Sequence, residues 1–258
     1  MSSILVTRDA EIATVTLNRP DKLNALTRDM WEQLGIAIRD LSAVDSLRCI
    51  VLRGAGGKAF AAGADISEFA TERANSRQAR GYGNLIAATM HAVGVSRHPT
   101  VALIEGACVG GGLEIAAMCD MRICGDSSRF GVPINKLGLT MGYGELAGLL
   151  ALVGRGTALE ILLEGRVFGA DEAFRKGLVN RVVPDSDVER EAYALAQRIA
   201  AGAPLVARWH KQYIERLSVR ADIPPEEWDE GFACFDTDDY RSGVKAFLDK
   251  TKPEFKGR

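Results

Sequence analysis

The sequence predicts an α/β fold in which strands and helices alternate along most of the chain and helices alone fill its C-terminal part. Three observations predict it. Short apolar or alternating segments are separated by stretches of helical periodicity, small-residue loops follow two of the strands, and strand patterns become sparse after residue 133. Helical crossovers between successive strands favour a parallel sheet whose strand-end loops form a crevice.

The first elements follow from periodicity. EIATVTLN at 11–18 alternates apolar and polar residues, as a half-buried strand does, and RCIVLRG at 48–54 is a short apolar strand. Between them Thr27 is the expected N-cap of a helix. The buried face of that helix is expected to carry Met30, Leu34, Ile38 and Leu41.

The middle of the chain continues this order. The loop AGGKAFAAGADI at 55–66 precedes a helix expected over roughly 77–95. The strand TVALIEG at 100–106 follows, and three glycines at 110–112 then open the apolar segment LEIAAM. The expected elements are therefore strand, helix, strand, helix, strand, helix.

Beyond 120–133 the chain reads as a succession of helices, with LVNRVV at 178–183 as the one late strand. The stretch AAGAP interrupts these helices, so an approximate boundary between two regions of the chain is expected near Gly202. This divides the chain into an α/β core at 1–202 and a helical region at 203–258. The expected helical segments lie at 145–154, 157–165, 170–177, 187–202, 205–217, 225–235 and 238–250.

Composition excludes several classes of partner. The formal net charge is -2 and both signs are scattered, so no basic face for nucleic acid is expected. Asp9 and Glu11 interrupt any signal-peptide core, and no later run of membrane-spanning length is free of charge. The five cysteines show no C-x-x-C pair and the three histidines lie far apart, which argues against a metal site. A cytoplasmic protein with reduced thiols and no membrane partner is expected.

Two small-residue loops point to chemistry. Gly110, Gly111 and Gly112 follow a strand and begin a helix, where unsatisfied backbone N–H groups attract an anion or a polarised oxygen. The loop FAAGADI at 60–66 also follows a strand. Two such loops can converge on one carbonyl oxygen and form an oxyanion hole. Taken alone, the three glycines could equally form a tight strand-to-helix turn packed against its neighbours, and FAAGADI could form a flexible surface turn.

Glu114 is the only charged residue between 106 and 119, within an apolar helix. Poor solvation disfavours its charged form, so its pKa is expected to rise toward neutral pH, which suits an acid/base catalyst. A buried structural carboxylate paired with Arg122 is the alternative interpretation.

These segments resemble the crotonase superfamily, whose enoyl-CoA hydratase and isomerase members act on acyl-CoA thioesters. The resemblance covers essentially the whole chain and rests on VTLNRPDKLNAL, GKAFAAGADI, EGACVGGGLEIAAMCDMRI, FGVPINKLGL, ADEAFRKGLVNRVV and SGVKAFLDKTKPEF. It implies a spiral of repeated strand-helix turns followed by helices. It also implies an enoyl-CoA hydratase that adds water across the 2,3 double bond, with coenzyme A as part of the substrate and no separate cofactor.

The resemblance assigns roles residue by residue. It implies that the backbone N–H groups of Ala64 and Gly111 hold the thioester oxygen and that Glu114 is the acid/base. The residues expected to contact CoA or the acyl group are Lys22, Leu23, Ala25, Ala62, Asp65, Ile66, Gly110, Ile134 and Gly142.

One departure from the family pattern bears on the activity. Hydratases of this family carry a second glutamate where this sequence has Ile134, which cannot transfer a proton. Glu114 alone could manage both proton transfers, or Glu145 could reach the site, although Glu145 could equally be a charge that stabilises a helix N-terminus. The remaining alternatives are isomerisation, thioester hydrolysis, decarboxylation, ring cleavage, or an acyl-CoA-binding scaffold without turnover. Ile134 also suggests a bulky or cyclic acyl group.

The C-terminal helices suggest an assembly. Their aromatic residues stand among charged residues, a pattern suited to packing against another surface, although an intramolecular core would explain it too. The resemblance implies a homotrimer or a dimer of trimers, with these helices at subunit contacts and covering the CoA site. Lys250 and Lys252 are candidates for contacts with the CoA phosphates.

Overall fold

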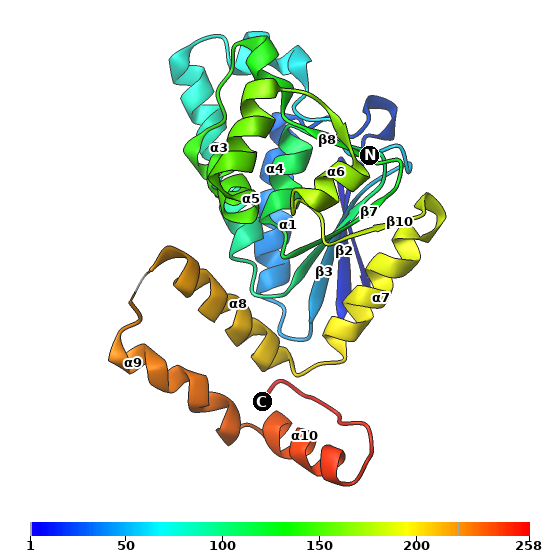
Figure 1. Ribbon diagram of the computed structural model, residues 1–258, viewed down its shortest axis with the longest axis vertical. Coiled ribbons are helices and arrows are strands. Elements are labelled where there is room, and N and C mark those ends of the chain that lie inside the picture. The colour runs from blue at the N-terminus through cyan, green and yellow to red at the C-terminus, as the bar shows by residue number, and fades with distance from the viewer. Residues whose placement is uncertain (1, 221) are drawn as a thin grey trace.

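Two β-sheets of different size form the framework of the protein (Figure 1). The structure is a computed structural model that describes residues 2–220 and 222–258. The larger sheet has the order β1-β2-β3-β5-β7-β10, and only its β1–β2 pair is antiparallel. The smaller sheet has the order β4-β6-β8-β9, and only its β8–β9 pair is antiparallel. The strands are β1 Ile4–Asp9, β2 Ile12–Leu17, β3 Cys49–Gly54, β4 Ala59–Ala61, β5 Thr100–Ile104, β6 Ala107–Val109, β7 Met121–Gly125, β8 Arg129–Gly131, β9 Phe168–Gly169 and β10 Arg181–Val183.

Consecutive strands alternate between the two sheets. β3, β5 and β7 belong to the larger sheet, and β4, β6 and β8, which follow them in the chain, belong to the smaller one. Helix α3 (Ser76–Gly94) leads from the first such turn to the second, and α4 (Gly111–Met118) leads from the second to the third. The predicted spiral of strand-helix turns is therefore confirmed. The other helices are η1 Pro20–Lys22, α1 Arg28–Ser42, η2 Ile66–Glu68, α2 Phe69–Glu72, η3 Pro133–Leu137, α5 Tyr143–Glu164, α6 Ala170–Arg175, η4 Asp185–Asp187, α7 Val188–Ala200, α8 Pro204–Val219, α9 Pro225–Trp228, η5 Asp229–Asp236 and α10 Asp238–Leu248.

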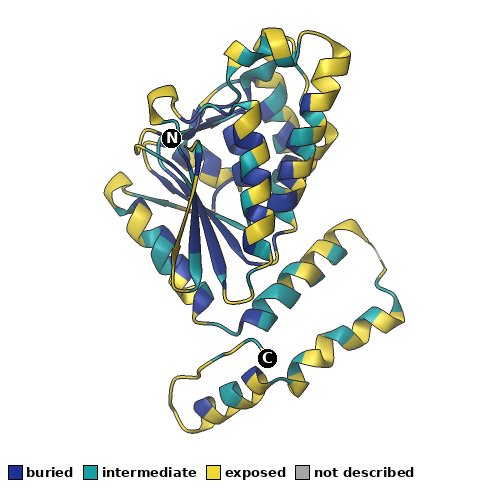
Figure 2. Cartoon of the chain, turned by 180° about the vertical axis from the view of Figure 1, so that it is seen from behind, coloured by how far each residue is buried: buried dark blue, intermediate teal, exposed yellow. Residues whose placement is uncertain are grey.

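The central strands of the larger sheet, β3, β5 and β7, are almost entirely buried, whereas the edge strand β1 is largely exposed (Figure 2). On one face α7 packs against β3, β5 and β7 through a small cluster that includes Val51, Leu103 and Val188. The main core lies on the other side, where the buried faces of α1, α3 and α4 meet. The predicted N-cap of α1 is confirmed, because the Thr27 hydroxyl accepts a hydrogen bond from the Met30 N–H. The residues expected on its buried face, Met30, Leu34, Ile38 and Leu41, are all buried.

Some elements differ from the sequence expectation. β1 was not anticipated, because it is an edge strand whose residues after Ile4 are exposed and therefore lack an alternating pattern. The helices expected at 145–154 and 157–165 form one element, α5, interrupted at Gly154, which has a φ of 71°. By length and composition alone α5 could cross a membrane. In this structure α5 packs on α3 and α4, and its residues Leu149, Ala158 and Ile161 are buried.

The C-terminal helices α8 to α10 extend away from the sheets (Figure 1). The expected boundary near Gly202 coincides with the turn between α7 and α8, while the division into two domains stays a prediction. The chain end returns to the core, where the Arg48 guanidinium donates hydrogen bonds to the carbonyls of Ala200 and Phe255. Asp239 is buried and accepts hydrogen bonds from the N–H groups of Lys256 and Gly257.

Candidate active site

A cavity of about 150 Å³ lies where the β4 and β6 loops meet the N-termini of α4 and α5. It brings together segments that are far apart in sequence. It is also the place where most of the predicted site residues converge. The predicted residues that line it are Ala62, Ala64, Ile66, Gly110, Gly111, Glu114, Ile134 and Glu145.

The two glycine-bearing loops touch at this cavity. Gly63 has a φ of +102° and Gly110 a φ of +51°, conformations that side chains rarely adopt. A Cβ atom added at Gly110 would lie 3.6 Å from the Gly63 Cα, and one added at Gly63 would lie 3.3 Å from the Val109 carbonyl oxygen. Glycine at these positions therefore lets the two backbones approach each other closely.

The loop after β4 presents the N–H of Ala64. Leu26 pairs with both neighbours of this residue, because its N–H donates to the Gly63 carbonyl at 2.8 Å and its carbonyl accepts from the Asp65 N–H at 2.8 Å. Within the described part of the chain the Ala64 N–H has no acceptor. The pairing that orients this loop thus leaves one donor available at the cavity.

The loop after β6 presents the N–H of Gly111 at the start of α4. The Gly110 N–H donates to the Gly131 carbonyl, and the Gly110 carbonyl accepts from the Glu114 N–H, both at 2.9 Å. Among the hydrogen bonds of residues 2–220 and 222–258, none satisfies the Gly111 N–H. A free donor at a helix N-terminus, where the helix dipole is positive, favours a negatively charged oxygen.

Glu114 lies on the first turn of α4 with only 7% of its surface exposed. Burial, with a smaller contribution from the Glu145 carboxylate, raises its pKa to about 8, while Arg73 opposes the rise. The carboxyl group is therefore mostly protonated at neutral pH. The expected rise of this pKa is confirmed.

The alternative interpretation of Glu114 as the partner of Arg122 is wrong. Arg122 is buried, and its guanidinium donates instead to the carbonyls of Leu178, Ala116 and Cys119. These carbonyls lie at the end of α4 and before β10, so Arg122 ties the far end of the helix to the sheet. Glu114 is left at the cavity without this counter-ion.

Glu145 fits both of the interpretations left open for it. It is the third residue of α5, and its Oε2 accepts a hydrogen bond of 2.6 Å from the Gly142 N–H, so it caps that helix. It also lines the cavity and acts electrostatically on Glu114. Two carboxyl groups from different helices therefore share the site.

Arg73 was not anticipated from the sequence. It follows α2 and lines the cavity, with its guanidinium carbon 4.7 Å from the centroid of the Phe69 ring and 3.9 Å from that of Tyr82. Periodicity and motif spacing gave no signal for it, because it lies in an irregular turn between two helices. The apolar wall was also missed, because its side chains come from separate elements that only the fold brings together: it includes Trp31, Phe69, Ile86, Leu137 and Leu139.

Five predicted contacts do not line the cavity in the described chain: Lys22, Leu23, Ala25, Asp65 and Gly142. The Leu23 carbonyl accepts a hydrogen bond from the Ala62 N–H. Asp65 forms an ion pair of 3.0 Å with Arg19, whose guanidinium also donates to the Ala25 carbonyl. Lys250 and Lys252 are exposed after α10 and lie outside the cavity lining.

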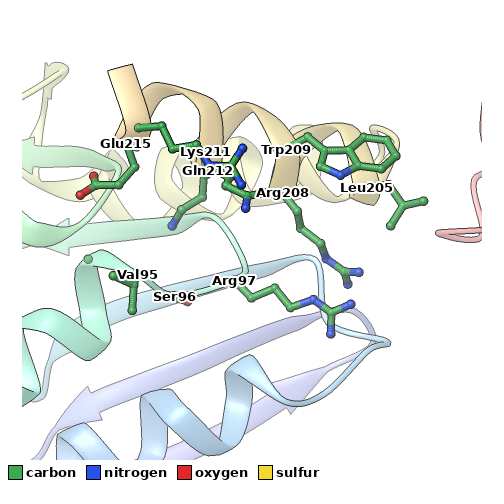
Figure 3. A pocket seen from close by; sticks show the side chains of 11 residues that line it. Val95, Ser96, Arg97, Leu205, Arg208, Trp209, Lys211, Gln212 and Glu215 are labelled. Carbon is green, nitrogen blue, oxygen red and sulfur yellow. The ribbon is translucent and has the colours of Figure 1, made fainter. Parts of the chain in front are cut away.

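A larger cavity of about 510 Å³ lies between α8 and the segment that follows α3 (Figure 3). It contains none of the predicted site residues. Two of its cations form ion pairs, Arg97 with Asp45 and Lys211 with Asp120. Within the described residues, no group of three or more metal-ligating side chains is placed to hold an ion.

The chain belongs to the enoyl-CoA hydratase/isomerase family, whose sequence model matches residues 7–258. The short-chain-enoyl-CoA hydratase of Clostridium acetobutylicum is 36% identical, over 100% of this chain and 99% of the relative. The crotonyl-CoA hydratase of Syntrophomonas wolfei is 33% identical, over 98% and 97%. A crystal structure described as an enoyl-CoA hydratase/carnithine racemase from Magnetospirillum magneticum superposes with a TM-score of 0.98 at 50% identity, covering 100% of this chain and 97% of that one. The predicted family and the crotonase fold are thereby confirmed.

Proposed function

We propose that this protein is an enoyl-CoA hydratase that adds water across the 2,3 double bond of an acyl-CoA thioester. One observation carries the proposal: a buried, largely protonated Glu114 shares a cavity with two backbone N–H groups that have no acceptor among the described residues. The family acts on acyl-CoA thioesters, and relatives named as enoyl-CoA hydratases match over nearly the whole chain.

In this proposal the N–H groups of Ala64 and Gly111 donate to the thioester oxygen. When water adds at C3, negative charge moves onto that oxygen and an enolate forms. Donors that are already oriented stabilise this charge without reorganisation, and removing one such donor costs about 3 kcal/mol of barrier. The positive end of the α4 dipole adds to the effect.

Two carboxyl groups then move the protons. The Glu145 carboxylate, held by its hydrogen bond to the Gly142 N–H, accepts a proton from the water whose oxygen bonds to C3. Glu114, kept protonated by burial, donates its proton to C2 as the enolate collapses. A proton returned from Glu145 to Glu114 resets the pair. The hydration step therefore balances without a cofactor, and we propose that none is used.

Ile134 marks the departure from the family pattern and lines the cavity. Because it cannot carry a proton, Glu145 takes over the second carboxyl role from a different helix. Isomerisation of the double bond is the second candidate, since one acid/base at Glu114 can remove and return a proton without Glu145. The two candidates differ in the need for Glu145.

We also propose that the protein works in the cytoplasm as a homotrimer or a dimer of trimers. The exposed aromatic side chains of the C-terminal helices support an assembly, because Trp228 is 66% exposed, Phe232 65% and Phe247 84% in the single chain. In this arrangement Lys22, Leu23, Ala25, Asp65 and Gly142 would contribute to CoA binding around the mouth of the cavity rather than to its wall.

The experiment follows the loss of the conjugated thioester in crotonyl-CoA and in a cyclic enoyl-CoA, with products identified by mass spectrometry. Hydration by the wild-type protein, abolished in Glu114→Gln and strongly reduced in Glu145→Gln, is the expected result. Because the acid must be protonated, activity should fall as pH rises above about 8. A shifted double bond that survives Glu145→Gln would establish the isomerase instead, and binding without any product would establish a scaffold.

A further inference from the structure

Arg73 lines the cavity of about 150 Å³ and forms no ion pair with any of the residues that the structure describes. Its Nε is buried and has no hydrogen-bond acceptor in the described chain. The ion pairs of residues 2–220 and 222–258 include none formed by Arg73. The guanidinium lies over the faces of Phe69 and Tyr82, and these two contacts limit its orientation.

Neither carboxyl group of the cavity forms an ion pair with this cation among the described residues. Glu114 is mostly protonated at neutral pH, and the Glu145 Oε2 accepts its hydrogen bond from the Gly142 N–H. The rest of the nearby wall is largely apolar, with Phe69, Ile86 and Leu139 among the lining side chains. A fixed cation in such surroundings gains most from a carboxylate brought by the ligand, because desolvation strengthens the interaction.

We propose that the acyl group of the substrate ends in a carboxylate and that Arg73 binds it. The substrate class is therefore the CoA thioester of a short unsaturated dicarboxylic acid. The proposal rests on the proposed function for the position of the thioester at Ala64 and Gly111. Because these residues and Arg73 line one cavity of about 150 Å³, the chain that joins the thioester to the carboxylate is short.

The geometry of the two groups favours this pairing. A guanidinium presents parallel N–H donors that match a carboxylate in a bidentate arrangement. Stacking on two rings limits its rotation, so little conformational entropy is lost when the ligand binds. A positively charged acyl end would be repelled at the same place.

The test compares two substrates that differ only in charge. Glutaconyl-CoA carries a terminal carboxylate, and its terminal carboxamide analogue has the same shape without the charge. The ratio of their kcat/KM values is measured for the wild-type protein, Arg73→Met, Arg73→Lys and Arg77→Met. Arg77 is an exposed arginine in the first turn of α3 that lies outside the cavity lining, so it serves as the matched control.

The expected wild-type preference for the carboxylate is about 10- to 100-fold, the range for a hydrogen-bonded charge pair. Arg73→Met should abolish the preference, Arg73→Lys should keep part of it, and Arg77→Met should leave it unchanged. Any effect of Arg73 on the pKa of Glu114 acts on both substrates alike and cancels in the ratio. Circular dichroism confirms that each variant is folded.

Two results would overturn the inference while leaving the hydratase intact. One is a wild-type protein that hydrates both substrates equally well. The other is an Arg73→Met variant that slows both by the same factor, which would show that Arg73 only positions the site.

Calorimetric binding of the saturated glutaryl-CoA and its carboxamide separates the inference from the proposed function. If no thioester is hydrated but glutaryl-CoA binds about 10-fold more tightly than its carboxamide, and only when Arg73 is present, the hydratase fails and carboxylate recognition stands. Equal binding of the two thioesters overturns the inference whatever the catalytic result.

Discussion

The clearest consequence of burying Glu114 is that its replacement by glutamine should stabilise the protein while removing its activity. The pKa of this carboxyl group is about 8 in the folded chain, against an ordinary value of 4.5. Because the pKa of Glu114 is higher in the folded chain than in the unfolded one, the contribution of its protonation to the free energy of unfolding is fully present below pH 4.5. This contribution is lost as the pH rises from 4.5 toward 8. Glutamine has a similar shape but does not titrate.

The magnitude follows from the two pKa values. At pH 7 the group is ionised in the unfolded chain and mostly protonated in the folded one. The interval from 4.5 to 7 corresponds to about 3 kcal/mol of destabilisation at roughly 1.4 kcal/mol per pH unit. Glu114→Gln should therefore raise the free energy of unfolding by about 3 kcal/mol at pH 7 and by less than about 1 kcal/mol at pH 5.

Urea unfolding at fixed protein concentration, followed by tryptophan fluorescence at pH 5, 6, 7 and 8, measures this difference. Glu32→Gln is the control, because Glu32 is exposed on α1 and should give no pH-dependent difference. A stabilisation that does not change with pH, or a Glu114→Gln variant less stable than the wild type at pH 7, would refute the argument from burial.

The remaining predictions concern the neighbours of Glu114 and the framework that holds it. Glu145→Gln should reduce the rate of hydration by about 100-fold, because the proton acceptor is lost. It should also move the alkaline limb of the pH–rate profile to lower pH, because the Glu145 charge that helps to raise the Glu114 pKa is gone. An unchanged profile would contradict this. Gly112→Ala should lower the free energy of unfolding by about 3 kcal/mol in thermal or urea unfolding, since its Cβ would lie 2.3 Å from the Ala61 carbonyl oxygen. A stability equal to that of the wild type would show instead that α4 can shift. Thr27→Ala should cost about 1 kcal/mol through loss of the α1 N-cap, measured in the same way, with no effect on the pH dependence of activity.

Local patterns predicted the fold where burial is periodic. Thr27 and the apolar face of α1 were predictable because an N-cap and a helical stripe are local signals. The edge strand Ile4–Asp9 was missed, although it forms a hairpin with the adjacent β2, because its residues after Ile4 are exposed and show no alternation. The division of the strands between two sheets was not predicted, because it follows from pairing between segments that are far apart in the chain.

The residues of the candidate site also divide into those that have a local signal in the sequence and those that do not. The two small-residue loops and Glu114, a lone carboxylate in an apolar run, are visible in the sequence, and the family resemblance then indicated Ala64 and Gly111 within those loops. Whether Glu145 reaches the cavity depends on how α5 packs against α4, which no local pattern reports. Arg73 gave no signal because its position depends on Phe69 and Tyr82, which belong to two different helices.

The most direct test of the catalytic proposal is a crystal structure with a non-hydrolysable acyl-CoA analogue bound. The thioester oxygen should lie within about 3 Å of the backbone nitrogens of both Ala64 and Gly111, with the Glu114 carboxyl facing C2 of the acyl chain. A thioester oxygen bound elsewhere, or a Glu114 carboxyl screened from the acyl chain by other side chains, would contradict the account.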